Sequence, residues 1–317
     1  MIAIVGGSGF IGTVLAMRLK KENINFKILD KNKSLEFPGE WEYCDVTDFN
    51  SLSSVLNDVS AIINLAAEHK DNVHPVSLYY DVNVLGAKNI CEAAVENNIK
   101  NIIFTSSVAV YGFVEKETSE NGEYHPFNHY GKSKLEAEYV YNAWFDKCED
   151  NRLITIRPTV VFGENNRGNV YNLFRQIASG RFLMIGSGDN KKSMAYVENI
   201  SAFIHYVTTN LPVGKYVFNY VDKPDFTMNE LTGIISKALG KKENNVKVPY
   251  AVGMLGGYIF DFLSKMTGRE FPVSSIRIKK FCARTQFKSD TISHLDFVAP
   301  VPLAEGISKT VRNEFLK

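Results

Sequence analysis

The chain has 317 residues, enough to bury one large α/β core or two smaller ones without disulfide or metal staples. Its 36 lysines and arginines are balanced by 35 aspartates and glutamates, so the formal net charge of +1 gives no electrostatic reason to expect a nucleic-acid or acidic-membrane partner. The four cysteines lack metal or redox-pair spacing, and the first five residues are typical of a buried strand rather than a signal peptide. We therefore expect a cytoplasmic protein with no metal site.

Short β-branched runs alternate with helical patterns in the first half of the chain. Strands are expected at 2–5, 26–30, 61–66, 102–105 and 153–157, and helices at 11–22, 49–58, 76–98 and 129–145. This alternation predicts a Rossmann-type, doubly wound α/β fold with a parallel sheet covered on both faces. We place this domain at 1–165, with a segment at about 190–220 returning to it. Residues 166–317 are expected to form mainly a smaller C-terminal substrate-binding domain.

The clearest local motif is the run Gly6-Gly7-Ser8-Gly9-Phe10-Ile11-Gly12, which follows an expected strand and opens an expected helix. Gly6, Gly9 and Gly12 permit a tight turn, and Phe10 and Ile11 belong to the first helical turn, so a pyrophosphate can approach its N–H groups. Asp30 ends the next expected strand, where a carboxylate binds ribose hydroxyls and repels a 2′-phosphate. We expect a dinucleotide site that favours NAD over NADP, although Lys31 and Lys33 soften that preference.

Three polar residues form a candidate catalytic group. Tyr130 and Lys134 have i, i+4 spacing, which places them on one face of the helix expected at 129–145. A nearby cation stabilises a phenolate, and Ser107, directly after an expected strand, can share a proton with the tyrosine. Each residue alone also fits an ordinary structural role, such as helix decoration or a strand-end serine.

Taken in this order, the motifs resemble the extended short-chain dehydrogenase/reductases, particularly the NAD-dependent epimerase/dehydratase family typified by UDP-glucose 4-epimerase. Further matching segments are Asp45 to Asp48, Asn64 to Ala67, Asn83, Arg157-Pro158, Tyr196 to Asn199 and a closing run from Leu295 to Ile307. The resemblance implies that NAD is also bound by Asp45, Val46, Leu65, Ala66, Ala67, Tyr130 and Lys134. It further implies that Tyr130 is the acid/base, assisted by Ser107.

The resemblance implies a nucleotide-sugar epimerase that inverts C4 through a transient 4-keto sugar. Val108 and Ala109 stand where the dehydratases carry an Asp-Glu pair, so elimination of water is disfavoured. Val160 stands where many epimerases have a substrate-contacting asparagine, which weakens the assignment to a standard UDP-hexose. The apolar stretch 249–266 leaves room for a lipid-linked sugar. The alternatives are an NAD(P)H-dependent reductase or dehydrogenase of 4-keto nucleotide sugars, serving deoxy-sugar or surface polysaccharide synthesis, and a non-catalytic NAD-binding regulatory protein.

Substrate and partner contacts are expected mainly from the second half of the chain. Lys191, Lys192 and Arg277 are candidate ligands of a substrate diphosphate, together with Ser107 at the reacting sugar. The apolar stretch 249–266 is too interrupted to span a membrane, and its helical spacing favours packing on a core or a partner, with peripheral lipid contact as the alternative. A homodimer is expected through the helices around 82–94 and 135–141.

Overall fold

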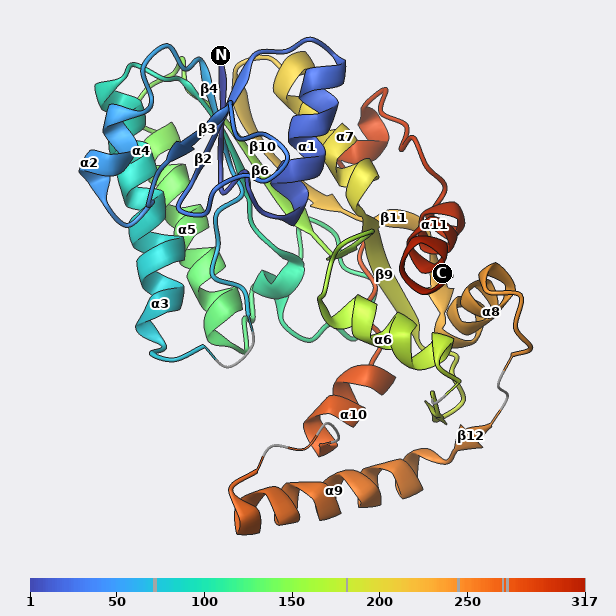
Figure 1. Cartoon of the computed structure of the whole chain (residues 1–317). Helices are drawn as coiled ribbons and strands as arrows, with labels where there is room; N and C mark the ends of the chain where they lie inside the picture. Colours follow the sequence, from blue (N-terminus) through green and yellow to red (C-terminus); the bar gives the residue numbers. More distant parts are fainter. Residues whose placement is uncertain (71–72, 181, 244–245, 270, 272–273, 317) are drawn as a thin grey trace.

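The computed structural model describes residues 1–70, 73–180, 182–243, 246–269, 271 and 274–316 (Figure 1). Its centre is a seven-stranded parallel sheet in the order β10-β6-β5-β4-β1-β2-β3. The strands are β1 (Ile2–Val5), β2 (Phe26–Asp30), β3 (Trp41–Tyr43), β4 (Ala61–Asn64), β5 (Asn101–Thr105), β6 (Arg152–Pro158) and β10 (Gly214–Tyr220). Because β1 pairs with both β2 and β4, the order reverses beside β1, and the expectation of a doubly wound fold is confirmed.

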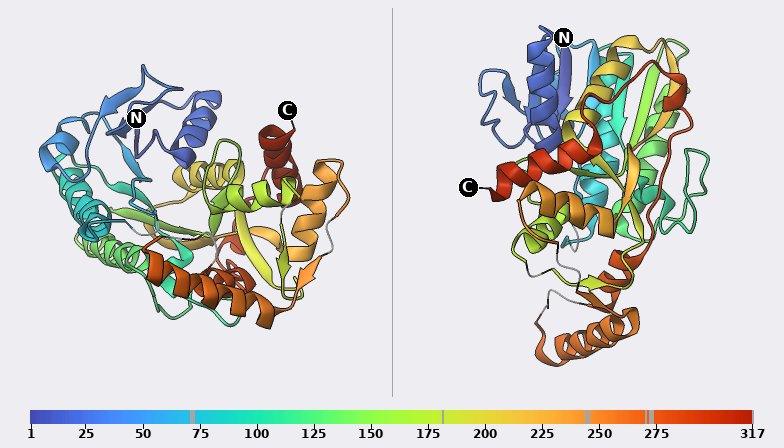
Figure 2. Two further views of the ribbon diagram at one scale, coloured as in Figure 1. Left: turned by 60° about the horizontal axis from the view of Figure 1, so that its bottom comes forward. Right: turned by 90° about the vertical axis from the view of Figure 1, so that its right-hand side faces the viewer.

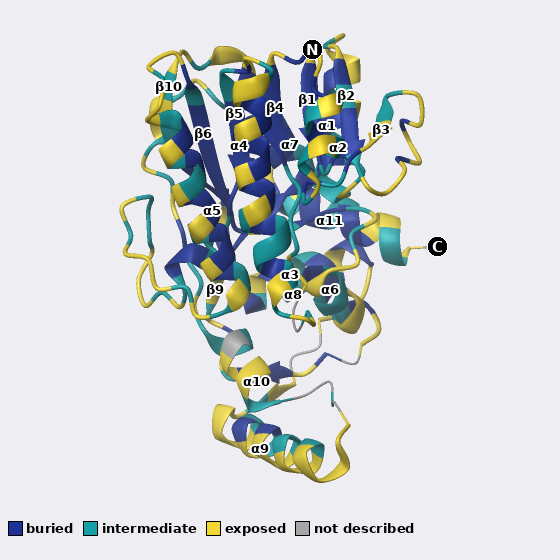
Figure 3. Cartoon of the chain, turned by 90° about the vertical axis from the view of Figure 1, so that its left-hand side faces the viewer, coloured by how far each residue is buried: buried dark blue, intermediate teal, exposed yellow. Residues whose placement is uncertain are grey.

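Helices cover both faces of this sheet, so its central strands consist of apolar residues almost throughout. On one face, α2 (Phe49–Ser54), α4 (Gly86–Glu96) and α5 (His129–Phe145) share a buried cluster with the strands. On the other, α1 (Phe10–Lys21) and α7 (Val197–Asn210) pack together and against the strands. Figure 3 shows dark, buried strands between helices whose outer faces are exposed. The sheet is thereby fixed as a rigid base for the loops at its edge.

The helix expected at 76–98 is present from Ser77 to Glu96, but it is not a regular α-helix throughout. The structure has α3 (Ser77–Tyr80), a π-helical turn at Asp81–Leu85 and then α4. The extra residue of a π turn rotates the chain locally and is often found near functional sites. Here it accompanies a buried Asn83, whose amide nitrogen donates to the Glu68 carbonyl at 3.1 Å and the Ser133 hydroxyl at 2.8 Å. Asn83 thus ties the loop after β4 to α5.

The C-terminal half adds a smaller layer beside the sheet (Figure 2). It contains a three-stranded sheet in the order β11-β9-β7 and a two-stranded pair β12-β8. The strands are β7 (Val160–Phe162), β8 (Met184–Ile185), β9 (Lys191–Tyr196), β11 (Asp222–Thr227) and β12 (Lys247–Val248). The helices α6 (Asn169–Ala178), α8 (Met228–Ala238) and α11 (Leu303–Phe315) pack on this layer around a third apolar cluster.

Several later segments contact the first half of the chain. β10 pairs along its whole length with β6, and α7 packs on α1.

The C-terminal residues are joined in turn to α7 and β9. The side chain of Asn199, in α7, accepts from the Val301 amide at 3.0 Å and donates to the Val301 carbonyl at 2.7 Å. Gly306 allows α11 to approach the Tyr196 ring, since an added Cβ would lie 2.7 Å from it. The proposed boundary near residue 165 stays a prediction.

The expectation that 249–266 packs on the core of this chain was wrong, whereas packing on a partner or on lipid stays a prediction. This stretch forms α9 (Tyr250–Thr267), which projects from the body beside α10 (Ser275–Cys282) (Figure 1). The predicted apolar stripe is exposed at Val252, Leu255, Ile259, Phe262, Leu263 and Met266. Helical periodicity correctly indicated a helix, but it does not determine which face is covered. No helix in the described part of the chain has the length and apolar character needed to cross a membrane.

The helix faces expected to form a homodimer are largely used within the chain. Ile90, Ala93 and Ala94 of α4 are fully buried in the cluster that includes the sheet. On α5, Tyr141 is also buried, whereas Tyr139 is exposed. These contacts account for most of the apolar pattern, and the homodimer stays a prediction.

Candidate active site

The predicted cofactor and catalytic residues come together at one edge of the sheet. The glycine loop follows β1, Asp30 ends β2, Ala66 follows β4 and Ser107 follows β5. Because these strands are parallel neighbours, their carboxyl ends meet where doubly wound folds bind ligands. The edge includes the reversal of strand order beside β1.

The glycine loop is shaped by close backbone contacts. Gly6 has a φ of +75°, and an added Cβ there would lie 2.5 Å from the Ala66 amide nitrogen. At Gly12 an added Cβ would lie 2.6 Å from the Gly7 Cα, so this glycine permits the crossing of strand and helix. Gly9 caps α1 without a side-chain hydrogen bond. The uncapped first turn of α1, with Phe10 and Ile11, is therefore suited to a phosphate group.

Asp30 lies against this loop. Its carboxylate accepts hydrogen bonds from the Ser8 amide at 3.1 Å and the Asn32 amide at 2.8 Å. These bonds hold a negative charge beside the glycine turn, the position from which a carboxylate binds ribose hydroxyls and opposes a 2′-phosphate. The arrangement fits NAD.

The remaining predicted cofactor residues line neighbouring loops. Asp45 accepts from the Thr47 amide at 2.9 Å, and the carbonyl of buried Val46 accepts from Asn89 at 2.8 Å. Leu65 and Ala67 flank Ala66, whose amide donates to the Asn64 side chain at 3.0 Å. These contacts fix the two loops on either side of the glycine turn. The structure therefore supplies a preformed frame for a dinucleotide.

The start of α5 carries Tyr130 close to Ser107. Asn128 caps this helix by accepting from the Gly131 amide at 2.8 Å. Gly131 lets the helix approach the Ser107 segment, since an added Cβ would lie 2.6 Å from the Ala109 carbonyl oxygen. Burial raises the pKa of Tyr130, and a hydrogen bond with the Ser107 side chain opposes this rise. Ser107 thus lies beside the phenol.

Lys134 lies one helical turn further along α5 and is almost fully buried. Its Nζ donates to the Thr105 carbonyl at 2.8 Å and lies 4.8 Å from the centre of the Phe104 ring. Burial lowers the pKa of Lys134 to about 7, and the Glu138 carboxylate opposes this shift. The ammonium is therefore anchored to the end of β5, beside the Ser107 segment.

A buried network behind Lys134 was missed in the sequence. The Arg157 guanidinium donates to both Glu138 oxygens, at 2.9 and 2.6 Å, and the Ser106 hydroxyl also donates to Glu138. Arg157 further donates to the hydroxyls of Tyr111 and Tyr124, each at 2.6 Å. The four-residue spacing of Tyr130, Lys134 and Glu138 on one helical face was the available signal.

Glu138 is a carboxylate close to the candidate catalytic residues, but its two oxygens are committed to Arg157 and Ser106. Val108 and Ala109, which continue the chain after Ser107, form a short 3₁₀ turn and bear no acid. Val160, on β7, is 45% exposed and offers only apolar surface. Among the described residues, no group of three metal-binding side chains is arranged to hold an ion.

The candidate phosphate ligands of the second half lie around α10. The Lys192 amine donates to the Ala283 carbonyl just after this helix, and burial lowers its pKa to about 8. Arg277 is exposed on α10 and donates to the Phe271 carbonyl at 2.9 Å. Lys191 is exposed at the start of β9. The structure thus brings Lys192 and Arg277 to the same helix, each bonded to a backbone oxygen, and their phosphate role stays a prediction.

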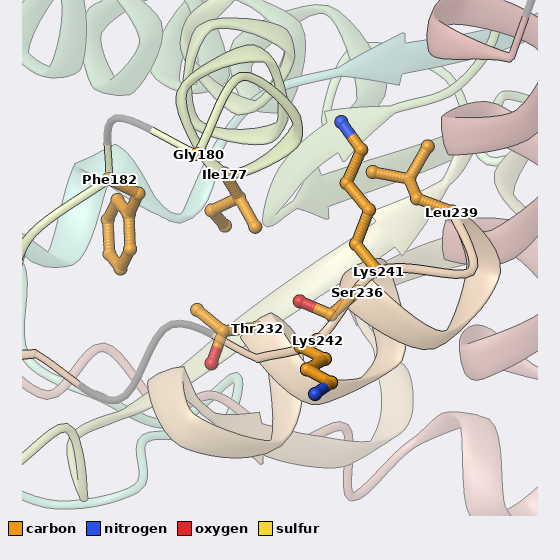
Figure 4. A pocket seen from close by; sticks show the side chains of 8 residues that line it. All are labelled: Ile177, Gly180, Phe182, Thr232, Ser236, Leu239, Lys241 and Lys242. Carbon is orange, nitrogen blue, oxygen red and sulfur yellow. The ribbon is translucent and has the colours of Figure 1, made fainter.

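A separate pocket lies between α6 and α8 (Figure 4). Ile177, Thr232, Ser236 and Lys241 line it, and the Lys241 amine donates to the Ala178 carbonyl at 2.6 Å. None of the predicted cofactor, catalytic or substrate residues belongs to its lining. This pocket is therefore distinct from the candidate active site.

Fold and site together define a dinucleotide-dependent enzyme of the extended short-chain dehydrogenase/reductase type. The model of the NAD-dependent epimerase/dehydratase family matches residues 2–219. The chain belongs to this family. It is an enzyme, and its cofactor is NAD.

Comparison with individual proteins agrees with this assignment. The chain is 50% identical over 316 residues to an N-acetyl-α-D-glucosaminyl-diphospho-ditrans,octacis-undecaprenol 4-epimerase of Escherichia coli O157:H7, covering 99% of this chain and 95% of that protein. It is 28% identical to a UDP-glucose 4-epimerase of Vibrio cholerae, covering 84% and 85%. A solved UDP-N-acetylglucosamine 4-epimerase of Bacillus cereus superposes with a TM-score of 0.76 at 22% identity, covering 98% and 97%. The expectation of an NAD-dependent epimerase of the nucleotide-sugar epimerase class is confirmed.

Proposed function

We propose that this chain inverts C4 of an N-acetylhexosamine carried by diphosphate on a polyprenol, rather than on a nucleotide. The observation that carries this proposal is the 50% identity, over nearly the whole of both chains, to an epimerase named for such a lipid-linked sugar. The apolar Val160 and the exposed α9 agree with a substrate unlike a standard UDP-hexose. The candidate active site supplies the chemistry.

Tyr130 is the proposed acid/base. Its phenolate takes the proton of the C4 hydroxyl, and Ser107, hydrogen-bonded to the phenol, donates to the same oxygen as it becomes a carbonyl. NAD held by the glycine loop would supply the hydride-accepting and hydride-donating chemistry at C4, so that inversion would need no net oxidant. Tyr130 then gives the proton back. Since Val108 and Ala109 add no acid or base, the residues support epimerisation without loss of water.

The proposed binding roles follow from position. The glycine loop binds the NAD pyrophosphate, and Asp30 binds the adenosine ribose. Asp45 and Val46 contact the adenine. The segment 65–67 lines the cofactor channel. Lys134, fixed by the Thr105 carbonyl, holds the nicotinamide ribose and supplies positive charge near the phenol. Lys192 and Arg277 are proposed diphosphate ligands, which requires each to exchange its present backbone partner for the substrate.

A cytoplasmic location, with peripheral contact to the membrane that holds the lipid, is part of the proposal. All four cysteines are free, which fits a reducing compartment. A homodimer is also proposed, on family resemblance alone.

The test is to incubate the protein and NAD with N-acetylglucosaminyl diphosphates of a short polyprenol and of uridine. NMR of the products then reports the configuration at C4, and absorbance reports NADH. Inversion of the polyprenol-linked sugar, without net NADH change, is expected. Inversion of the uridine-linked sugar alone would contradict the lipid assignment. Stoichiometric consumption of NAD(P)H with a 4-keto nucleotide sugar would select the reductase alternative.

A further inference from the structure

The helix α9 stands apart from the body of the protein in Figures 1 and 3 and in the right-hand view of Figure 2. Its inner face packs on α10, where Gly257 allows close approach because an added Cβ would lie 2.8 Å from the Ser275 Cα. Asp261 accepts from the Ser275 amide at 3.4 and 3.3 Å and from its hydroxyl. Only Met254 and Gly257 are buried among the residues of α9. The helix is therefore held on one side.

The opposite side of α9 is an apolar surface, which we call the α9 face. On a helix with about 3.6 residues per turn, its members project away from Met254 and Gly257, except Tyr258, which lies at the edge of the face one turn after Met254. Leu255 and Phe262 are each 62% exposed and Met266 is 70% exposed. The other members are Val252, Tyr258, Ile259 and Leu263. A continuous exposed surface of this kind marks an interaction site rather than scattered surface residues.

The charge around this face differs from that of the whole chain. Residues 250–284, the part of the sequence that spans α9 and α10, contain six lysines and arginines and two acidic residues, whereas the rest of the chain contains 30 and 33. Lys265, Arg269, Arg277 and Lys279 are exposed on or near α9 and α10. The segment that carries the apolar helix face therefore has excess positive charge, although the charge of the whole chain is nearly balanced. The exclusion of an acidic-membrane partner from net charge does not hold for this segment.

The combination of an apolar helix face with nearby basic residues indicates what binds to α9. Apolar residues enter the boundary between headgroups and acyl chains, while neighbouring lysines and arginines attract anionic headgroups. A second copy docked face to face would bring two basic segments together, and like charges at an interface oppose association. Because α9 has no spanning character, it fits a helix that lies in the plane of the membrane surface.

We propose that the α9 face docks the protein on an anionic lipid bilayer, with the helix parallel to the surface. Leu255, Phe262 and Met266 enter the interface, and the basic segment binds the headgroups. The consequence for the substrate rests on the proposed function. Docking brings the candidate active site to a diphosphate-linked sugar whose polyprenol stays in the bilayer. The substrate then does not have to leave the membrane.

The test is flotation of the full-length protein with vesicles of phosphatidylcholine alone or with 30% phosphatidylglycerol. We compare wild type with the double variant L255S/F262S, and with L35S/V298S as the control, since Leu35 and Val298 are 92% and 86% exposed elsewhere. We expect wild type and control to float with the anionic vesicles, less so at 0.5 M salt. The L255S/F262S variant should lose at least tenfold in bound fraction while its melting temperature stays unchanged.

Equal flotation of L255S/F262S and wild type, or no flotation of wild type, would overturn the proposal. Sedimentation of a wild-type dimer that L255S/F262S converts to monomer, without vesicle binding, would assign the face to a second copy instead. Flotation requires no turnover, so a failure to invert the lipid-linked sugar would contradict the proposed function and leave the docking result standing.

Discussion

Arg157 holds the Glu138 carboxylate through two hydrogen bonds of 2.9 and 2.6 Å, with both side chains buried. Glu138 follows Lys134 by one helical turn and raises the pKa of that lysine against the lowering effect of burial. Arg157 in turn reaches Tyr111, whose hydroxyl donates to Asn219 on β10 at 2.8 Å. The ion pair therefore connects the charge on Lys134 to the edge of the main sheet.

The variant E138Q tests Glu138 as a positioning residue. Loss of its charge should lower the pKa of Lys134 further, so activity at pH 7.5 should fall by about tenfold if that pKa moves by about one unit. Activity should recover as the pH is lowered, because the lysine is protonated again. Stability should fall by about 3–5 kcal/mol, since Arg157 is left buried without a counter-ion. The measurements are pH–rate profiles and urea unfolding.

The matched control for that experiment is E136Q, an exposed glutamate on the same helix. It should leave both the pH–rate profile and the stability at wild-type values. If E138Q unfolds more easily but keeps the wild-type pH profile, Glu138 has only a structural role.

The variant Y130F should lower kcat by about 10²–10⁴-fold, because it removes the group proposed to move the proton. Its melting temperature should change little, and NAD should still bind. Tyr139 provides the control, since it lies on the same helix and is 55% exposed. Full activity in Y130F would show that another group carries the proton.

The sheet and the cofactor loop could be predicted because their signals are local. β1, β2 and α5 have the bounds expected from the sequence, since β-branched runs, glycine turns and helical spacing act over a few residues. The exposed face of α9 could not be predicted from spacing. An apolar stripe is the same in sequence whether a core, a lipid or a second chain covers it.

The site was predicted only where its residues belong to a recognisable motif. Asn83 and Arg157 stood in matching segments, but their roles depend on contacts with residues far away in the sequence. The π turn that accompanies Asn83 also escaped prediction, because tertiary hydrogen bonds to Glu68 and Ser133 accompany it. Long-range polar networks have no local pattern, so sequence spacing alone gave only the Tyr130 and Lys134 side of the site.

The variant G12A should disrupt the glycine loop. An added Cβ would meet the Gly7 Cα at 2.6 Å, and relieving this overlap should cost about 1–3 kcal/mol of stability and weaken NAD binding. Gly39 has no atom within 4 Å of an added Cβ, so G39A is the control and should match wild type. The measurements are urea unfolding and calorimetric titration with NAD. Wild-type NAD affinity in G12A would contradict the assigned role of the loop.

The variant D30N should relax the preference for NAD. Asparagine retains a hydrogen-bond acceptor for the Ser8 amide but removes the charge that repels a 2′-phosphate, so NADP affinity should rise by roughly tenfold. E36Q removes an exposed acid nearby in sequence and should leave the preference unchanged. Equal NAD-to-NADP affinity ratios in D30N and wild type would show that another group discriminates against the 2′-phosphate.

The variant K134M should lose activity and gain stability, and the gain in stability should depend on pH. The pKa of Lys134 is about 7 in the folded chain against an ordinary value of 10.5, so the unfolded chain binds this proton more tightly. The cost of burying the charged amine is fully present below pH 7 and disappears as the pH rises towards 10.5. K134M should therefore raise the free energy of unfolding more at pH 6 than at pH 10, measured by urea unfolding without NAD. The exposed K132M is the control, and an equal change at both pH values in K134M would mean that the buried lysine is not the titrating group.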